Sequence, residues 1–114
     1  MLEIVEYRAS WPQEFRDIAG VMRHGLGSLA LRIDHIGSTS VPGLAAKDKI
    51  DIQISVAALD QQAVDAMLRI GYTQSLRNLG DHTPPGFIGP PEEWEKFYFR
   101  PPPGQRETNT HMRV

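Results

Sequence analysis

Hydrophobic residues near the start of the chain recur at intervals of three and four positions. The set is Trp11, Phe15, Ile18, Met22, Leu26 and Leu29. This spacing places them on one face of a helix. Ser10 precedes the first of them and Gln13 follows Ser10 by three residues, which is the spacing of an N-terminal capping box. We expect Gly25 and Gly27 to end the helix.

Strict alternation of apolar and polar residues replaces this pattern later in the chain. Such alternation predicts a strand with one buried face, here formed by Ile50, Ile52, Ile54 and Val56. Another strand is expected over residues 30–36, with Leu31, Ile33 and His35 on one face. The two strands are separated by a long connection.

A second helix is predicted from an N-cap at Asp60 to a stop at Gly71. Its apolar stripe consists of Val64, Met67, Leu68 and Ile70. Further strands are expected over residues 2–5, 95–100 and 107–114, the last two as a hairpin. This order predicts a single α+β domain over residues 1–114, in which two helices pack on one side of a mixed or antiparallel sheet.

Composition narrows the classes of function. The chain has 114 residues, a formal net charge of −2 and no cysteine. Near-neutral charge argues against a nucleic-acid duplex as partner, because neutralising phosphates requires clustered lysine and arginine. Disulfides and thiolate zinc sites are excluded. No stretch approaches the ~20 apolar residues of a membrane span, and the first residues lack a secretory-signal pattern. We therefore expect a cytoplasmic protein that does not bind a membrane.

The connection over residues 37–49 is long for a small domain, and such loops are usually functional. It does not fit a phosphate-binding P-loop, because the second glycine comes one position too late and Lys47 is followed by Asp48. It also does not fit a nucleophile elbow, which needs Gly, Ser and Gly at alternate positions.

A turn that binds an anion fits this segment better. Gly37 and Ser38 directly follow a predicted strand, and such a turn presents backbone N–H groups and a hydroxyl to a negative charge. Asp51 and Gln53 share one face of the next strand, because strand side chains alternate. A carboxylate at this place is suited to hold Mg²⁺ against phosphate oxygens.

The run HIGSTSVPGLAAK, followed after two residues by IDI, resembles the GrpB family of small bacterial proteins, which belongs to the nucleotidyltransferase superfamily. The similarity extends to the segment around Trp11, the Gly71–Tyr72 step, residues 94–99 and residues 110–114, so it covers nearly the whole chain. The resemblance implies a nucleotidyltransferase-like core. Some family members are fused to dephospho-CoA kinase, which implies a link to coenzyme A metabolism.

The resemblance also implies a nucleotide site with a bound Mg²⁺. Asp51 would be both the metal ligand and the catalytic carboxylate. The nucleotide would be bound by Gly37, Ser38, Thr39, Ser40 and Lys47. We expect the same cleft to be lined by His35, Gln53, Arg100, His111 and Arg113. His82, in the proline-rich loop over residues 80–92, is a further candidate for a lid contact.

Three departures from the family pattern bear on this site. The superfamily strand carries two carboxylates at alternate positions, but here the second is Gln53, which supplies no charge. Asp48 and Lys49 stand where the family has proline and an apolar residue. A late His-x-His pattern appears as His111 and Arg113, and the chain is shorter than family members that continue with further helices. Missing helices predict an exposed apolar surface or a homodimer.

Three functions therefore remain open from the sequence. The first is Mg²⁺-dependent transfer of a nucleotidyl group, and the second is non-catalytic binding of a nucleotide or a coenzyme A-related ligand in the same cleft. The third is a structural or assembly role. One carboxylate alone binds Mg²⁺ weakly, unless Asp48 or Glu107 supplies a second.

Overall fold

The computed structural model describes residues 3–75 and 96–114. The elements over these residues are β1 (Ile4–Val5), α1 (Trp11–Leu26), the 3-10 turn η1 (Gly27–Leu29), β2 (Ala30–Ile36), the 3-10 turn η2 (Ser38–Ser40), β3 (Ala46–Lys47), β4 (Ile50–Val56), α2 (Gln61–Arg69), β5 (Thr73–Ser75), β6 (Lys96–Arg100) and β7 (Thr108–Arg113). The predicted proline-rich loop and His82 lie outside the described residues.

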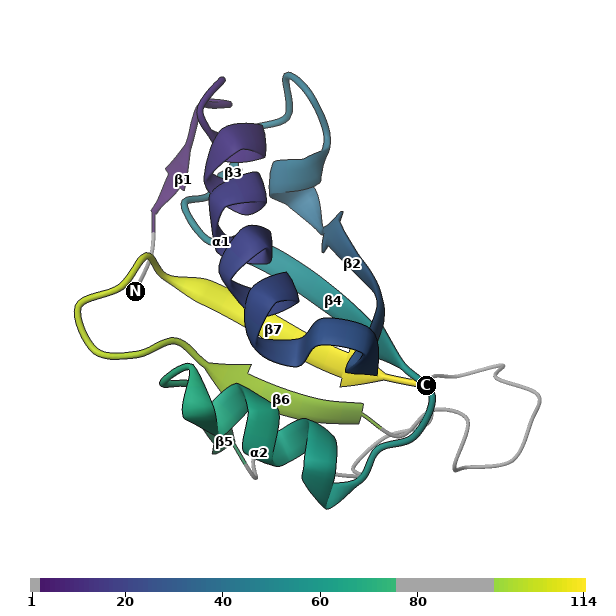
Figure 1. Cartoon of the computed structure of the whole chain (residues 1–114). Coiled ribbons are helices and arrows are strands. Elements are labelled where there is room, and N and C mark those ends of the chain that lie inside the picture. The colour runs from purple at the N-terminus through teal and green to yellow at the C-terminus, as the bar shows by residue number, and fades with distance from the viewer. Residues whose placement is uncertain (1–2, 76–95) are drawn as a thin grey trace.

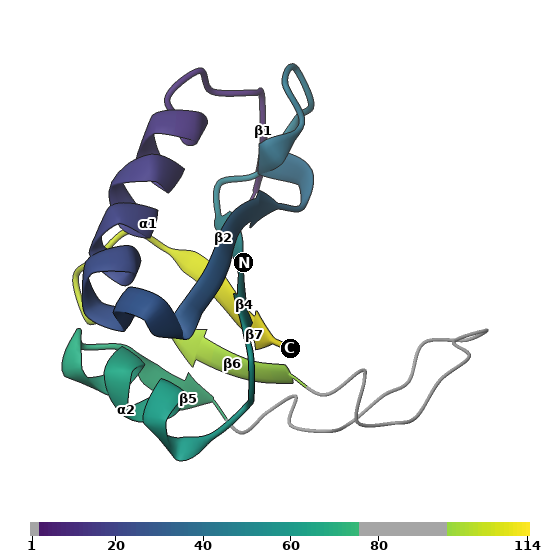
Figure 2. The ribbon, with the colours of Figure 1, turned by 45° about the vertical axis from the view of Figure 1, so that its right-hand side comes forward.

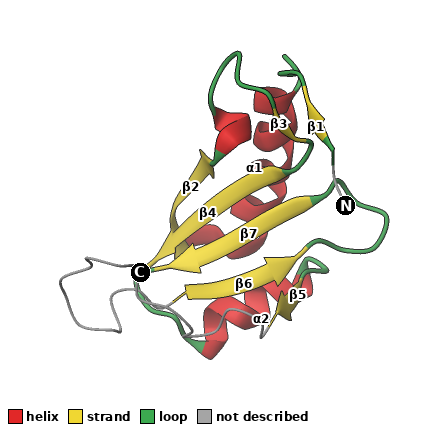
Figure 3. Ribbon diagram, turned by 180° about the vertical axis from the view of Figure 1, so that it is seen from behind, coloured by secondary structure: helices red, strands yellow, loops and turns green. Residues whose placement is uncertain are grey.

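The main sheet in the described part of the chain has the strand order β2-β4-β7-β6-β5 (Figure 1). β4 and β7 are parallel, whereas all other neighbours are antiparallel, so the sheet is mixed. Both helices lie on the same face of this sheet, and the view from behind shows the other face (Figure 3). The predicted α+β fold, with two helices on one side of a mixed sheet, is confirmed. The hairpin of β6 and β7 is confirmed as well.

The predicted opening strand, β1, does not join the main sheet. It pairs antiparallel with β3, so that Ile4 lies opposite Lys47 and Val5 opposite Ala46. The long connection after β2 therefore contains a short strand that the sequence pattern did not predict. This pairing places the lysine-bearing end of the connection beside the start of the chain.

The core lies between the sheet and the two helices (Figure 2). The alternating residues of β4 are buried as predicted, and α1 contributes buried Trp11, Ile18, Met22 and Leu26. On β4 and β7 the opposite face carries the polar side chains Asp51, Gln53, Ser55, Asn109, His111 and Arg113. Along these two strands the face turned away from the helices is thus polar. Neither described helix is long and apolar enough to cross a membrane.

The predicted ends of α1 are confirmed only in part. Ser10 occupies the N-cap position but makes no capping bond, because its hydroxyl donates to Oε2 of Glu14 (3.2 Å) instead. Gly27, with φ of +55°, ends the helix. Gly25 remains helical, and a Cβ there would collide with the side chain of Ile70. Its role is therefore to let α1 and the end of α2 pack closely.

Two residues expected on apolar faces are exposed. Leu31 is 59% exposed because the register of β2 against β4 shifts by one residue at this point, which makes Leu31 the extra residue of a bulge. Leu68 is 46% exposed, and α2 instead buries Ala63 and Ala66 beside the predicted Val64 and Met67.

Both ends of α2 match the prediction. Oδ1 of Asp60 accepts a hydrogen bond from the backbone N–H of Ala63 (3.0 Å), as an N-cap does. At the other end, the N–H of Gly71 donates to the carbonyl of Leu68 (3.0 Å), and the N–H of Tyr72 donates to that of Met67 (3.1 Å). This pair of bonds is a Schellman motif, for which the positive φ of Gly71 is suited.

Candidate functional site

The chain makes a tight turn where β2 ends. Gly37 has φ of +74° and ψ of −168°, a conformation that is essentially restricted to glycine. The backbone N–H and the hydroxyl of Ser40 both donate to the carbonyl oxygen of Gly37, at 3.1 and 2.5 Å. The N–H of Val41 donates to the carbonyl of Ser38 (3.2 Å). The expected Gly-Ser turn therefore forms, and the Ser40 hydroxyl closes it.

Asp51 lies directly against this turn. A Cβ on Gly37 would overlap Oδ2 of Asp51, so this position needs glycine for space as well as for conformation. Oδ1 of Asp51 accepts a hydrogen bond from Nδ2 of Asn109 (3.0 Å), its opposite neighbour in the parallel pair of β4 and β7. The sequence did not indicate Asn109, because no local pattern shows that β7 pairs with β4.

A pocket of about 250 Å³ opens beside the turn. Four residues predicted for the site line it, namely Ser38, Thr39, Lys47 and Asp51. The rest of the described lining is Ile4, Ala45, Ala46, Lys49 and Asn109. We call this the turn pocket. The end of the long connection, the turn after β2 and the carboxylate-bearing strand β4 all contribute to its lining.

His35 lies under the turn and outside the described lining of the turn pocket. It faces α1, where its ring stacks on Phe15 with centroids 4.9 Å apart. Its Nε2 is 2.9 Å from Oγ1 of the buried Thr39, whose hydroxyl donates to the carbonyl of Lys49 (3.4 Å). Burial lowers the pKa of His35, and the negative charge of Asp51 only partly opposes this. His35 thus supports the turn as a neutral ring.

Lys47 and Lys49 both line the turn pocket, whereas the Asp48 carboxylate between them is bound elsewhere. The backbone N–H of Lys49 donates to the carbonyl of Lys47 (2.8 Å), which makes a three-residue γ-turn. Oδ1 of Asp48 accepts from the indole N–H of Trp11 (2.9 Å), at the start of α1. The γ-turn therefore lets both lysines line the turn pocket, while the carboxylate of Asp48 is bound by residues outside its described lining.

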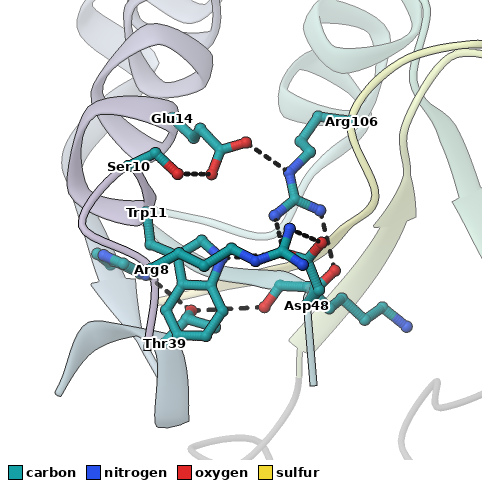
Figure 4. A network of polar contacts seen from close by, with 9 residues as sticks. Arg8, Ser10, Trp11, Glu14, Thr39, Asp48 and Arg106 are labelled. Carbon is teal, nitrogen blue, oxygen red and sulfur yellow. Dashed lines mark hydrogen bonds and ion pairs between the residues drawn. The ribbon is translucent and has the colours of Figure 1, made fainter. Parts of the chain in front are cut away.

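Arg106 completes a polar network around Asp48 (Figure 4). Its Nε donates to Oε1 of Glu14 (2.9 Å), its Nη1 to the backbone carbonyl of Asp48 (2.9 Å), and its Nη2 to Oδ1 of Asp48. Nη1 of Arg8 donates to Oδ2 of Asp48 (2.9 Å). The hydrogen bond from Trp11 holds the pKa of Asp48 below its ordinary value; burial opposes this shift, and Arg106 and Arg8 add to it.

This network changes the interpretation of Asp48. The sequence offered its carboxylate as a second metal ligand, but the structure places both carboxylate oxygens against the donors of Trp11, Arg106 and Arg8. Arg106 was missed by sequence reasoning, since it lies 92 positions from Glu14. The only signal was Asp48 itself, a charged residue where the resemblance to the GrpB family implies a proline.

The remaining predicted residues lie further along the uncovered sheet face. Gln53 lies opposite His111, and Arg113 lies opposite Ser55, in the pairing of β4 with β7. The ring of His111 contacts that of Tyr98 at a centroid distance of 4.3 Å. These three candidates are outside the described lining of the turn pocket, and Arg100 lines a second, larger cavity.

Carboxylates are scarce at this site. Among residues 3–75 and 96–114, no group of three His, Cys, Asp or Glu side chains is placed to hold a metal ion. Asp51 is the single acid in the described lining of the turn pocket. Glu107 lines the larger cavity and forms an ion pair with Lys49 at 3.8 Å. Mg²⁺ is often bound through one or two carboxylates, with phosphate and water as its other ligands, and Asp51 fits that arrangement.

Comparison with known proteins shows the family that this chain matches and several similar proteins. The sequence model of the GrpB protein family matches residues 1–114. The crystal structure of conserved protein GrpB from Enterococcus faecalis is similar with a TM-score of 0.69 and 30% identity over 97% of this chain. A UPF0157 protein of Halalkalibacterium halodurans is 41% identical over 67% of this chain. A dephospho-CoA kinase of Mycolicibacterium paratuberculosis is 35% identical over 91% of it.

The chain spans only part of each of these proteins. It covers 61% of the Enterococcus faecalis chain, 40% of the Halalkalibacterium halodurans protein and 29% of the dephospho-CoA kinase. The activity of the longer proteins therefore does not transfer directly to the residues described here.

Proposed function

The chain belongs to the GrpB family, and we propose that it binds a small phosphorylated ligand, a nucleotide or a coenzyme A-related molecule, in the turn pocket. The observation that carries the proposal is the convergence of the turn at Gly37 with Lys47 and Lys49 on one pocket. Backbone N–H groups in tight turns and lysine ammonium groups are common partners of phosphate oxygens.

The charges around the turn pocket favour an anionic ligand. Its described lining has two lysines and one carboxylate, Asp51. Asp48 lies between the two lysines, but its charge is paired with Arg8 and Arg106. Lysine acts as a mobile point charge and has no fixed bidentate geometry, which suits a flexible chain of phosphates.

We further propose that Mg²⁺ enters this pocket together with the phosphates. Asp51 would supply one carboxylate ligand, and the hydrogen bond from Asn109 orients that carboxylate. When bound, the ion would screen the repulsion between Asp51 and the phosphate oxygens. With a single acid in the described lining, binding of Mg²⁺ in the absence of the ligand is expected to be weak.

Transfer of a nucleotidyl group at the same pocket is the second candidate. The contact between Asp51 and the Gly37 turn favours it, because a metal and a phosphate-binding turn would then meet at the reacting group. Gln53 argues against it, since the second charge expected on this strand is missing, and Asp48 is engaged elsewhere. We therefore propose ligand binding as the main function and expect transfer to be weak or absent.

Isothermal titration with ATP and with coenzyme A, each with and without Mg²⁺, tests this function. We expect Lys47→Ala to weaken binding about tenfold or more, because it removes a charge-assisted hydrogen bond. Asp51→Asn is expected to abolish the strengthening by Mg²⁺. Arg69→Ala changes an exposed arginine of α2 outside the described lining and should leave binding unchanged.

The outcomes separate the candidate functions. Binding that neither Lys47→Ala nor Asp51→Asn affects would reject the turn pocket as the site. A failure to bind either compound would favour the structural role. Incorporation of label from an α-labelled nucleotide would show transfer, and binding without incorporation would show a binding module.

A further inference from the structure

A second, larger cavity of about 520 Å³ adjoins the turn pocket. Its described lining comes mainly from β6, from the turn after it and from the start of β7, and it includes Tyr98, Arg100, Pro101–Pro103 and Gln105. We call it the proline cavity. Lys49 and Asn109 line both cavities and so mark the boundary between them.

We propose that the two cavities form one bipartite site. The turn pocket takes the phosphate chain of a ligand, and the proline cavity takes a flat, polar ring attached to that chain, as in a nucleoside triphosphate. This proposal rests on the proposed function and specifies the class of ligand: a polyphosphate without a ring would fill only the smaller part.

The volumes of the two cavities favour a ligand that occupies both of them. Pockets for ligands of drug size measure about 300–1,000 Å³. The turn pocket, at about 250 Å³, is below this range. The proline cavity is within the range and shares Lys49 and Asn109 with the turn pocket, which places the two cavities next to each other.

The lining of the proline cavity suits a polar ring. Tyr98 and the three prolines present flat surfaces, and the Tyr98 ring is oriented by its contact with His111. Aromatic side chains stack on nucleic-acid bases with little dependence on sequence. Gln105 offers hydrogen-bond donors and an acceptor at the same cavity. This mixture of flat and polar groups fits a heterocycle better than an aliphatic chain.

Lys49 connects the two parts. Its carbonyl accepts from Thr39 under the turn, and its ammonium group pairs with Glu107 at the edge of the proline cavity. In this position the ammonium group lies where a phosphate chain would join the rest of the ligand. Since Glu107 is 55% exposed, the existing ion pair is weak and can yield to a phosphate.

Titrations with sodium tripolyphosphate and with ATP test the bipartite site. We expect ATP to bind more tightly than tripolyphosphate, and Lys47→Ala to weaken both. Tyr98→Ala should weaken ATP at least about fivefold, because a stacking surface is lost, and leave tripolyphosphate unchanged. Gln105→Trp, in the exposed turn, fills the same cavity without removing a packed side chain and should act in the same way. Arg69→Ala is the control.

The outcomes distinguish this inference from the function it rests on. If ATP binds no more tightly than tripolyphosphate, or if neither Tyr98→Ala nor Gln105→Trp weakens it, the bipartite site is wrong while the phosphate pocket stands. If tripolyphosphate does not bind, or binds equally well to the Lys47→Ala variant, the proposed phosphate pocket is wrong. The bipartite site, which depends on that pocket, is then wrong as well.

Discussion

Gly37 is under two independent constraints. Its backbone conformation excludes other residues by their own sterics, and a Cβ would in addition overlap the Asp51 carboxylate on a neighbouring strand. The second constraint brings the candidate ligand-binding acid into direct contact with the turn. The geometry of the proposed site therefore depends on the absence of one side chain.

Comparing Gly37→Ala with Gly43→Ala separates these constraints. Gly43 also has a positive φ, of +81°, but a Cβ there would meet nothing within 4 Å. Each substitution should cost about 1–3 kcal/mol of unfolding free energy through backbone strain. Gly37→Ala should cost more, because Asp51 must also move. Urea unfolding measures both, and equal losses would show that the contact with Asp51 is unimportant.

His35 should make stability depend on pH. Because burial lowers its folded-state pKa below the ordinary 6.5, the unfolded chain takes up the proton first as the pH falls. Its contribution is therefore complete above pH 6.5 and decreases below it. We expect the unfolding free energy to fall less between pH 7 and pH 5 in His35→Gln than in the unaltered chain. Identical slopes in the two proteins would contradict this expectation.

At the scale of elements, the polar network around Asp48 links three segments that are distant in sequence. Trp11 and Glu14 belong to the start of α1, Asp48 to the connection before β4, and Arg106 to the turn before β7. Fixing Asp48 also fixes the γ-turn that holds Lys47 and Lys49 at the turn pocket. The network therefore positions Lys47 and Lys49, although its own members are outside the described lining of the turn pocket.

Replacing the two arginines of this network should have unequal effects. Arg106 is 23% exposed and makes three hydrogen bonds, so Arg106→Ala should cost about 1.5–3 kcal/mol. Arg8 is 52% exposed, and a surface ion pair contributes only about 0–1 kcal/mol. A double-mutant cycle with Asp48→Asn should show coupling with Arg106. Losses of similar size for both arginines, without coupling, would reject Arg106 as the centre of the network.

Elements that depend on local sequence patterns were predicted, whereas pairings between residues far apart in the sequence were not. The helices and β4 were predicted because periodicity and the cap at Asp60 are local signals. The pairing of β1 with β3, the parallel neighbour β7 and the partners of Asp48 join residues far apart in sequence, and no local pattern shows them. The capping box at Ser10 was wrong because Glu14 offered its hydroxyl a charged acceptor.

At the scale of the molecule, helices cover one sheet face, and the candidate site lies at the ends of β2, β4 and β7 (Figure 3). The sequence placed Ser38, Thr39, Lys47 and Asp51 together because the turn and the strand are close along the chain. It did not separate them from Gln53, His111 and Arg113, which lie on the same polar face but further from the turn.

The most direct test of the account is to map ATP binding on the protein by NMR, following the backbone amide signals during titration with ATP and Mg²⁺. We predict the largest changes at residues 37–40, at Lys47 and Lys49, and at Asp51 and Asn109, with smaller changes at residues 98–100, 104 and 105. Changes confined to the helices α1 and α2, or the absence of any change at millimolar ATP, would contradict the central claim that the turn pocket binds phosphate.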